Sequence, residues 1–505
     1  MEQLKIGWGR REISTEEPVS IPGQMYLRIS QGIQDPLYVT ALAIDGGAGQ
    51  DCVIFCSCDL VKLYEGLITE TKALVSGVRP ELPVDSIIMN VTHTHAGTSP
   101  RNETEKAADG TYIYPSSAYR KFFLQMCADA IVEAWDTRAP GGIGYGYGYA
   151  VVAHSRRVVY FHDQGVKSNS VAPNGHCIMY GNTNDPDFSH YESSGDHFLN
   201  VLFTFDAENK LTGIVANVPC PSQVTEQLTR LSADYWHDVR ELVAKEFGPE
   251  VYVLPQCAPA GDLAPRILHY GNAQARRMKL KYDMGYDPEK AKVKMSRDDL
   301  NKRFSERKDI AERIVAGIKE VYGWAKDEIF THLPVLHRRW MQPMERRYVT
   351  DEELQQCEEK LRQMEQNIPE PGEDPVKYRR AVSQYNAVKR RNETILYRYG
   401  RQYEYPAPPI AVHAVAIGDI CFATNKFELY QDFMHRVQAR SPFTQSFLIQ
   451  LAGDEGGTYL ATKRSEENKG YGASLFCNWI GHVGGQQWVE GVLENLEAMK
   501  KSLEQ

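Results

Sequence analysis

The sequence predicts an α/β protein in which mixed β-sheets with flanking helices are interrupted by a charged helical insertion. Residues 1–260 alternate short β-branched segments, bounded by turn residues, with helix-like segments. A charged stretch with helical periodicity then covers 285–400, and strand-like segments return after it. Because polar residues follow predicted strands in both halves, we expect one domain over 1–505 with the insertion inside it.

The composition is that of a globular protein, with 505 residues of which 42% are apolar and 24% charged. A net charge of −9 argues against a nucleic-acid partner, and no apolar run is long enough to span a membrane. The ten cysteines are scattered without a C-x-x-C pair, and the N-terminus lacks an apolar leader segment. We therefore expect reduced, buried thiols in a cytoplasmic protein that acts on a small molecule, while nothing in the pattern sets the oligomeric state.

Short segments rich in β-branched and aromatic residues predict the strands. They are 38–45, 52–59, 86–92, 142–149, 198–205, 212–218, 251–254, 410–416, 420–424 and 446–451. The segment GIGYGYGY places its glycines on one face of a strand, which indicates close approach of another backbone. A flexible glycine-rich loop is the alternative.

Helical periodicity predicts helices at 117–138, 230–247 and 485–503. Inside the insertion, one helix begins at Ser296, and Thr350 with Glu353 forms a capping box that begins a second. The loop 368–375 ends the second helix, and a third helix follows. We expect these helices to form a hairpin or a lid.

His93 and His95, in SIIMNVTHTHAGTSP, follow a predicted strand, where α/β proteins commonly build their active sites. Residues i and i+2 of a strand share a face, so the two imidazoles should converge. They could share a metal ion, or one could bind it while the other transfers a proton. Two histidines bound to structural neighbours are the alternative.

Three further segments carry candidate residues after predicted strands. Cys220 lies between two prolines in VPCPSQV. Its thiol is a candidate metal ligand or nucleophile, and a thiol packed in the core is the alternative. Glu428 lies among apolar residues in KFELY, where a carboxylate should be paired or bound to a metal ion. A carboxylate that stabilises the N-terminus of a helix is the alternative. Tyr459 follows a glycine-rich loop in GDEGGTYLAT. Asp59 and Asp234 are weaker candidates, with a turn and a helix start as their alternatives.

In this order, the segments resemble the catalytic domain of the neutral (non-lysosomal) ceramidases. NVTHTHAGTSP is similar to the specific T-H-T-H-S-G-P signature of that family. GWGRREIS with QDPLYVTALAI resembles its start, and AGDLAP, KFELY and GTYLAT resemble its later motifs. The resemblance covers most of 1–485 outside the insertion.

The resemblance implies one zinc ion per chain, with four ligands: His93, Cys220, Glu428 and Tyr459. Cys220 stands where the family has a histidine, and thiolate is an accepted zinc ligand. The resemblance also implies that His95 lies beside the scissile carbonyl. It places Arg156, in SRRV, where the family has an active-site arginine, with Arg157 as its rival.

Two departures from the family change what the resemblance implies. The family serine of G-D-V-S-P is Ala264 here, so a serine–acyl intermediate is excluded there and direct attack by metal-activated water is expected. The C-terminal immunoglobulin-like domain of the family is not expected in this chain. The stretch 179–197 is very polar, which indicates a hydrophilic substrate if it lines the site; a solvated loop is the alternative.

We therefore expect a zinc-dependent hydrolase that cleaves an amide bond of a small polar substrate. A metal-dependent isomerase or lyase acting on a carbohydrate-like substrate is the first alternative, suggested by 179–197. A non-catalytic ligand-binding relative is the second, suggested by Ala264 and Cys220.

Overall fold

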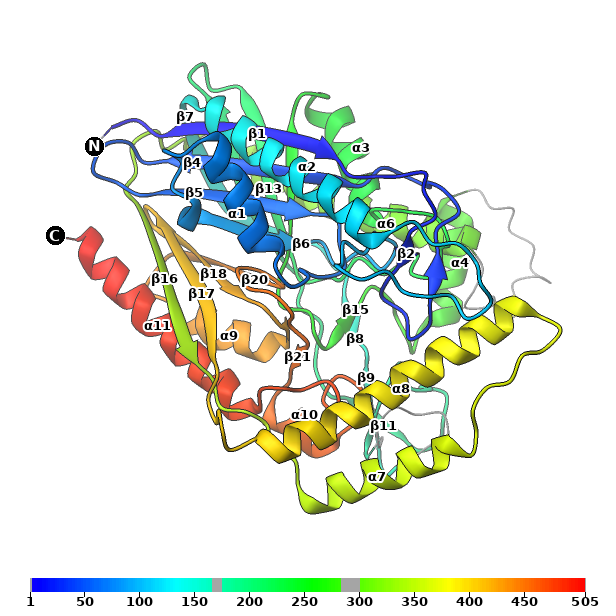
Figure 1. The fold of residues 1–505 in the computed structure, drawn as a ribbon. Helices are drawn as coiled ribbons and strands as arrows, with labels where there is room; N and C mark the ends of the chain where they lie inside the picture. The colour runs from blue at the N-terminus through cyan, green and yellow to red at the C-terminus, as the bar shows by residue number, and fades with distance from the viewer. Residues whose placement is uncertain (1, 166–174, 283–299, 505) are drawn as a thin grey trace.

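The computed structural model describes residues 2–165, 175–282 and 300–504 (Figure 1). Its mixture of helices and mixed sheets confirms the predicted α/β class. The larger sheet has eight strands in the order β14-β13-β12-β7-β1-β4-β5-β6. In chain order they are β1 Lys5–Glu12, β4 Tyr38–Asp45, β5 Cys52–Cys58, β6 Ile87–Val91, β7 Ala139–Tyr149, β12 Phe198–Asp206, β13 Leu211–Val218 and β14 Tyr252–Cys257.

A second sheet has four strands in the order β16-β17-β18-β20. They are β16 Val335–Pro343, β17 Pro409–Ile417, β18 Ile420–Asn425 and β20 Gln445–Gln450. The two sheets share an apolar layer, which includes Leu42 of β4 and Val415 of β17. Within it, the Phe55 ring of β5 lies 4.9 Å from that of Phe422 in β18, which stacks on Phe447 of β20 at 4.5 Å. Burial of this layer holds the sheets together.

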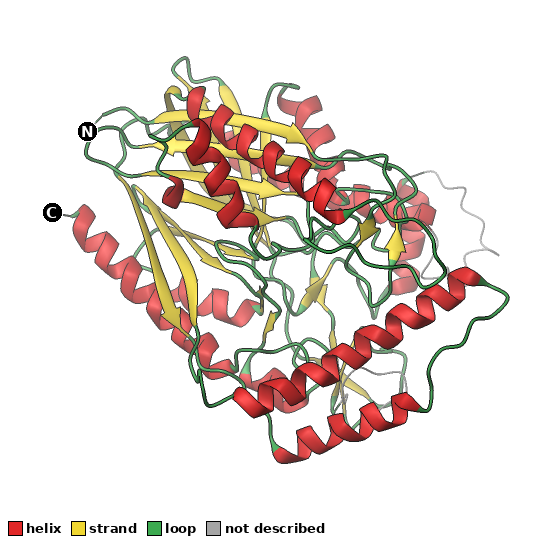
Figure 2. Cartoon of the chain, viewed as in Figure 1, coloured by secondary structure: helices red, strands yellow, loops and turns green. Residues whose placement is uncertain are grey.

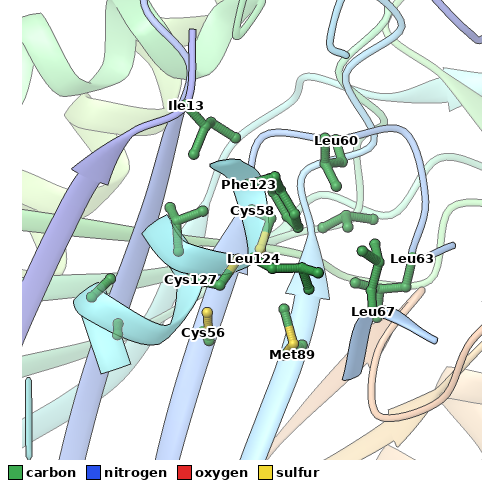
Figure 3. Close-up of a cluster of buried hydrophobic side chains, with 14 of the residues drawn as sticks. Ile13, Cys56, Cys58, Leu60, Leu63, Leu67, Met89, Phe123, Leu124 and Cys127 are labelled. Carbon is green, nitrogen blue, oxygen red and sulfur yellow. The ribbon is translucent and has the colours of Figure 1, made fainter. Parts of the chain in front are cut away.

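Helices lie on the outer sides of both sheets (Figure 2). The larger sheet carries α1 Leu67–Val78, α2 Ser116–Asp136, α3 Tyr235–Phe247 and α6 Leu300–Ala325, and the smaller carries α9 Gln431–Arg440 and α11 His482–Leu503. Figure 3 shows Cys56 and Cys58 of β5 beside Cys127 and Phe123 of α2 in the core. All ten cysteines are buried and none forms a disulfide, as predicted.

Glycines allow two helices to approach the larger sheet closely. A Cβ atom on Gly7 or Gly9 of β1 would lie 2.1 Å from a carbonyl oxygen of α2. A Cβ atom on Gly144 of β7 would lie 2.9 Å from the backbone oxygen of Ala325 in α6, which confirms the approach predicted from GIGYGYGY. The sequence does not predict β1, because these glycines replace the apolar alternation of a typical strand.

The segment 285–400 contains a strand as well as helices, which corrects the prediction of a purely helical insertion. β16 pairs antiparallel with β17 along its whole length, and most of its residues are half-exposed, so charged side chains hide its alternation. The helices after β16 are α7 Asp351–Glu365 and α8 Pro375–Arg401. α7 begins at the predicted capping box, where the Glu353 amide donates to Thr350 Oγ1 at 3.2 Å. Ser296 lies outside the described residues.

Short paired strands hold loops from distant parts of the chain together. β8 His154–Ser155 pairs with β15 Leu263–Ala264, and β19 Glu428–Leu429 pairs with β21 Tyr459–Leu460. The other elements are β2 Ser20–Ile21, β3 Arg28–Ile29, η1 Val84–Ser86, β9 Arg157–Tyr160, β10 Cys177–Met179, β11 Phe188–Tyr191, α4 Gly271–Lys281 and α10 Lys463–Asn468. In the described ranges, none of the helices is long and apolar enough to cross a membrane.

Candidate active site

His93 and His95 converge just after β6, as the sequence predicts. Their Nε2 atoms lie 3.3 Å apart. They converge for a different reason than the predicted strand, because both lie in the loop that follows it and His93 adopts a left-handed φ of 61°. The Nδ1 atom of His93 lies 2.7 Å from the carbonyl oxygen of Val61, which leaves its Nε2 atom facing the centre. Gly23 provides space for His95, since a Cβ there would lie 2.7 Å from the imidazole.

Glu428 and Tyr459 reach the same centre from the C-terminal half of the chain. They are directly opposed in the β19–β21 pair. Glu428 Oε2 lies 3.4 Å from His93 Nε2. A Cβ atom on Gly261 would lie 2.3 Å from the backbone oxygen of Glu428, so only glycine permits this close approach of the two loops. The centre is therefore assembled between loops that follow strands of both sheets.

Arg156 joins the two sides of this centre. One of its terminal nitrogens donates to the Gly261 carbonyl oxygen at 2.8 Å and to the Tyr459 hydroxyl at 3.1 Å, and lies 3.5 Å from Glu428 Oε2. Arg157 lies elsewhere, in a buried ion pair with Glu192. Of the two rival arginines, the structure brings Arg156 to the candidate site.

Charges at the centre are set by burial and by neighbours. Burial raises the pKa of Glu428, but its interactions with His93 and then Arg156 outweigh burial and lower that pKa to about 2, so Glu428 is ionised. Burial, and then His93, lowers the pKa of His95 well below its usual value. Burial raises the pKa of the Tyr459 hydroxyl despite the neighbouring Arg156.

Glu226 is a site residue that the sequence analysis misses. Its Oε2 atom lies 3.5 Å from His95 Nδ1, and its Oε1 atom accepts from Arg266 at 2.5 Å. Arg28 donates to the backbone oxygen of His95 from the other side. In the sequence, Glu226 stands out only as a carboxylate in TEQL, six residues after Cys220, and it belongs to no recognisable motif.

Tyr180 is a second site residue that the sequence does not identify. Its hydroxyl accepts from Gln223 Nε2 at 3.0 Å and lies 3.4 Å from a terminal nitrogen of Arg156. Tyr180 has a φ of 58°, so a local backbone turn that the sequence does not reveal sets its direction.

The structure does not bring the Cys220 thiol to this centre. Its Sγ atom lies 3.5 Å from the carbonyl oxygen of Val152, within an apolar core cluster, and burial raises its pKa well above the usual value. In the part of the chain that the structure describes, no group of three or more His, Cys, Asp or Glu side chains is placed to hold a metal ion. The predicted ligand set with Cys220 is therefore not assembled.

Two weaker candidates have structural roles. Asp59 forms a buried pair with Arg240, at 2.8 and 3.1 Å. Asp234 caps α3 and accepts from the amide and the hydroxyl of Thr225 at 2.7 and 2.6 Å. These carboxylates stabilise the loops behind the site, which matches the alternatives stated for them.

Polar side chains of 179–197 pair with one another or with nearby surface groups. Asp187 accepts from His162 at 2.6 Å, and Asp196 accepts from His435 at 2.7 Å. Asn182 accepts from the amide of Asn184 in a local turn. These three side chains therefore have structural partners, whereas Tyr180 of the same stretch lies at the candidate site.

The fold is thus an α/β sandwich with a polar centre built from loops of both sheets. Two solved structures share this fold over the whole of this chain. One is the neutral ceramidase from Pseudomonas aeruginosa, with a TM-score of 0.67, 16% sequence identity and 75% of that chain covered. The other is a ceramidase complexed with C2, with a TM-score of 0.63, 15% identity and 76% covered. The likeness confirms, at the level of the fold, the resemblance drawn from the sequence.

Comparison with protein-family models and with curated proteins gives no match.

Proposed function

We propose that this chain is a hydrolase that cleaves an amide bond, with a zinc ion held by His93, Glu428 and Tyr459. The observation that carries the proposal is the spacing of the donor atoms. Two ligands about 2.1 Å from a tetrahedral zinc lie about 3.4 Å apart. His93 Nε2 and Glu428 Oε2 lie 3.4 Å apart. The shared fold with two ceramidase structures supports the reaction class, because ceramide is itself an N-acyl amide.

The donor set is suited to a catalytic zinc rather than a structural one. Metal-binding histidines commonly donate their other ring nitrogen to a carbonyl or a carboxylate, and His93 Nδ1 lies 2.7 Å from the Val61 carbonyl oxygen. Without Cys220, three protein groups remain, and catalytic zinc sites commonly have three protein ligands and one open position. Zinc, when bound, supplies polarisation of a carbonyl group and activation of water at neutral pH.

The residues around the centre have separate tasks in this proposal. His95 faces the centre through Nε2 and is placed to accept the proton that an attacking water loses. Glu226 faces His95 Nδ1 and orients the ring. Arg156, bound to Tyr459 and close to Glu428, holds those two side chains and binds negative charge that develops on the carbonyl oxygen.

Metal content measured by mass spectrometry tests the site. The protein purified without chelator should carry one zinc per chain, and His93→Ala and Glu428→Gln should each lose it together with amine release from N-acyl substrates. His162→Ala is the matched control, because that histidine is exposed and pairs with Asp187 on the surface. Full zinc content in His93→Ala, or none in the wild type, would reject the metal centre. Products formed without the addition of water would favour the isomerase or lyase over the hydrolase. Binding of a ligand without turnover would favour the non-catalytic ligand-binding relative.

A further inference from the structure

Helix α8 is anchored at two points on either side of its middle. In its first half, the Ser383 hydroxyl accepts from the Leu27 amide at 3.0 Å, and the next residue, Arg28, donates to the backbone oxygen of His95. Near its end, Arg398 donates to the Leu475 carbonyl oxygen at 2.7 Å. Figure 1 shows α8 running below the larger sheet, past β9. The part of α8 between the two anchors is therefore held between the loop of Leu27 and that of Leu475.

Arg391, in this middle part, is bound next to a candidate zinc ligand. Its guanidinium lies 5.5 Å from the Tyr471 ring and donates to the Tyr471 hydroxyl at 3.4 Å. The Tyr471 ring in turn lies 5.8 Å from that of Tyr459. One terminal nitrogen of Arg391 is buried without a hydrogen-bond partner among the described residues. A buried donor left unpaired costs free energy, so a ligand that accepts from it would be stabilised.

Lys62 brings a second positive charge to the His93 side of the centre. It follows Val61, whose carbonyl oxygen binds His93, and its Nζ atom lies 5.3 Å from the Tyr64 ring. Arg101 lies against the same ring at 5.3 Å, but its charge is paired with Glu105 at 3.1 Å.

Arg390, exposed on α8, adds a third charge. Burial lowers the pKa of Lys62, and the charges of Arg101 and Arg390 lower it further, which places these cations within repulsive range of one another. The Glu428 carboxylate opposes this effect by raising the pKa of Lys62. Its own ion-pair partners, however, are His93 and Arg156. Among the described residues, no carboxylate forms an ion pair with Lys62, Arg390 or Arg391.

We propose that Lys62, Arg390 and Arg391 bind an anionic group of the substrate, so that the amide cleaved at this centre carries a carboxylate or a phosphate. The inference rests on the proposed function and adds the substrate class. Guanidinium groups bind both anions through paired hydrogen bonds, and partial burial strengthens the attraction. An anion would also relieve the repulsion among the three cations and use the unpaired donor of Arg391.

Two pairs of substrates test the proposal, each differing only in charge. N-acylglycine and N-acylglycinamide test the carboxylate, and N-acylethanolamine phosphate and N-acylethanolamine test the phosphate. We expect one anionic member to have a kcat/KM higher by about tenfold or more, because charge-assisted hydrogen bonds are strong. In Arg391→Gln and Lys62→Gln, this ratio should fall towards one through an increase in KM. Lys389→Gln, which neighbours the cluster and pairs only with Glu393 at 3.8 Å, should keep the ratio.

Binding of inorganic phosphate, measured by titration calorimetry at constant ionic strength, does not depend on turnover. Arg391→Gln and Lys62→Gln should each bind phosphate about tenfold more weakly than the wild type and Lys389→Gln. That result without cleavage of any amide would reject the hydrolase and keep the anion site. Amide cleavage with equal kcat/KM within both pairs, or phosphate affinity that no substitution changes, would overturn the anion site alone.

Discussion

Arg156 and Arg157 are adjacent in the chain and almost equally buried, with 2% and 0% of their surface exposed, yet their surroundings differ. Arg157 donates to Glu192 Oε1 at 3.1 Å and to the carbonyl oxygens of Lys469 and Tyr471 at 2.7 and 3.1 Å. Arg156 faces the candidate site, and its Nε atom is buried without a partner among the described residues.

The difference separates a structural charge from a functional one. Successive residues of an extended chain point to opposite sides, so the same residue type meets a closed network on one side and the site on the other. A closed network satisfies every donor and stabilises the fold. A site keeps donors available for a ligand, which costs stability in its absence.

The largest expected effect comes from removing the structural arginine. Arg157→Gln should lower the free energy of unfolding by about 3–5 kcal/mol, because it leaves the Glu192 carboxylate buried without its counter-charge. Urea denaturation measures this. Arg440→Gln is the control, since its pair with Glu490 is exposed to solvent and should contribute far less to stability. Equal destabilisation by both substitutions would contradict the structural role of Arg157.

The second substitution changes the site-facing arginine. Arg156→Gln should reduce kcat for an N-acyl substrate about 10²–10³-fold, the usual effect of losing one donor to developing charge. Its unfolding free energy should fall by less than that of Arg157→Gln. Arg156→Lys should recover part of the activity, because it restores charge without the planar donor geometry. Wild-type turnover in Arg156→Gln would remove Arg156 from the reaction.

The sequence predicts those parts of the molecule that depend on local pattern. The strands before the site are β-branched and bounded by turns. The sequence also places His93 and His95 together after a strand, although a left-handed turn at His93, and not the strand alternation, brings them together. Glu428 and Tyr459 are candidates because they follow predicted strands, but only the family resemblance connects them with His93, more than 300 residues earlier in the chain. β16 was missed because a half-exposed strand does not show apolar alternation.

The remaining differences arise from side-chain direction, which position alone does not give. Cys220 occupies the expected position, but its thiol points into the core. Arg156 and Arg157 are indistinguishable until the backbone direction is known. Tyr180 and Glu226 reach the site through turns whose geometry tertiary packing decides.

Cys220 provides a smaller test of the same distinction between core and site. Cys220→Ala should lower the free energy of unfolding by about 1–2 kcal/mol, since it removes a buried sulfur atom from a packed cluster. Zinc content should stay at the wild-type level. Loss of zinc in Cys220→Ala, with the fold intact by circular dichroism, would restore Cys220 as a ligand and require the thiol to turn.

The smallest effect concerns a pair of histidines on neighbouring strands of the smaller sheet. His337 of β16 and His413 of β17 lie 2.9 Å apart between Nε2 and Nδ1, so one donates and the other accepts while both are neutral. Burial lowers the pKa of His337 from 6.5 to about 4, although the adjacent Asp51 opposes this, and burial also lowers the pKa of His413. Because the unfolded chain binds these protons more readily, the contribution to stability is complete above pH 6.5 and is lost as the pH falls towards 4.

His337→Gln measures that contribution, because glutamine does not titrate. Between about pH 7 and about pH 5, the wild type should lose about 1 kcal/mol more unfolding free energy than the variant, less than the full pKa shift implies because His337 is partly exposed. Urea denaturation at the two pH values gives the difference directly. An identical loss in both proteins would show that His337 binds its proton as readily in the folded chain as in the unfolded one, and that its burial contributes no pH dependence to stability.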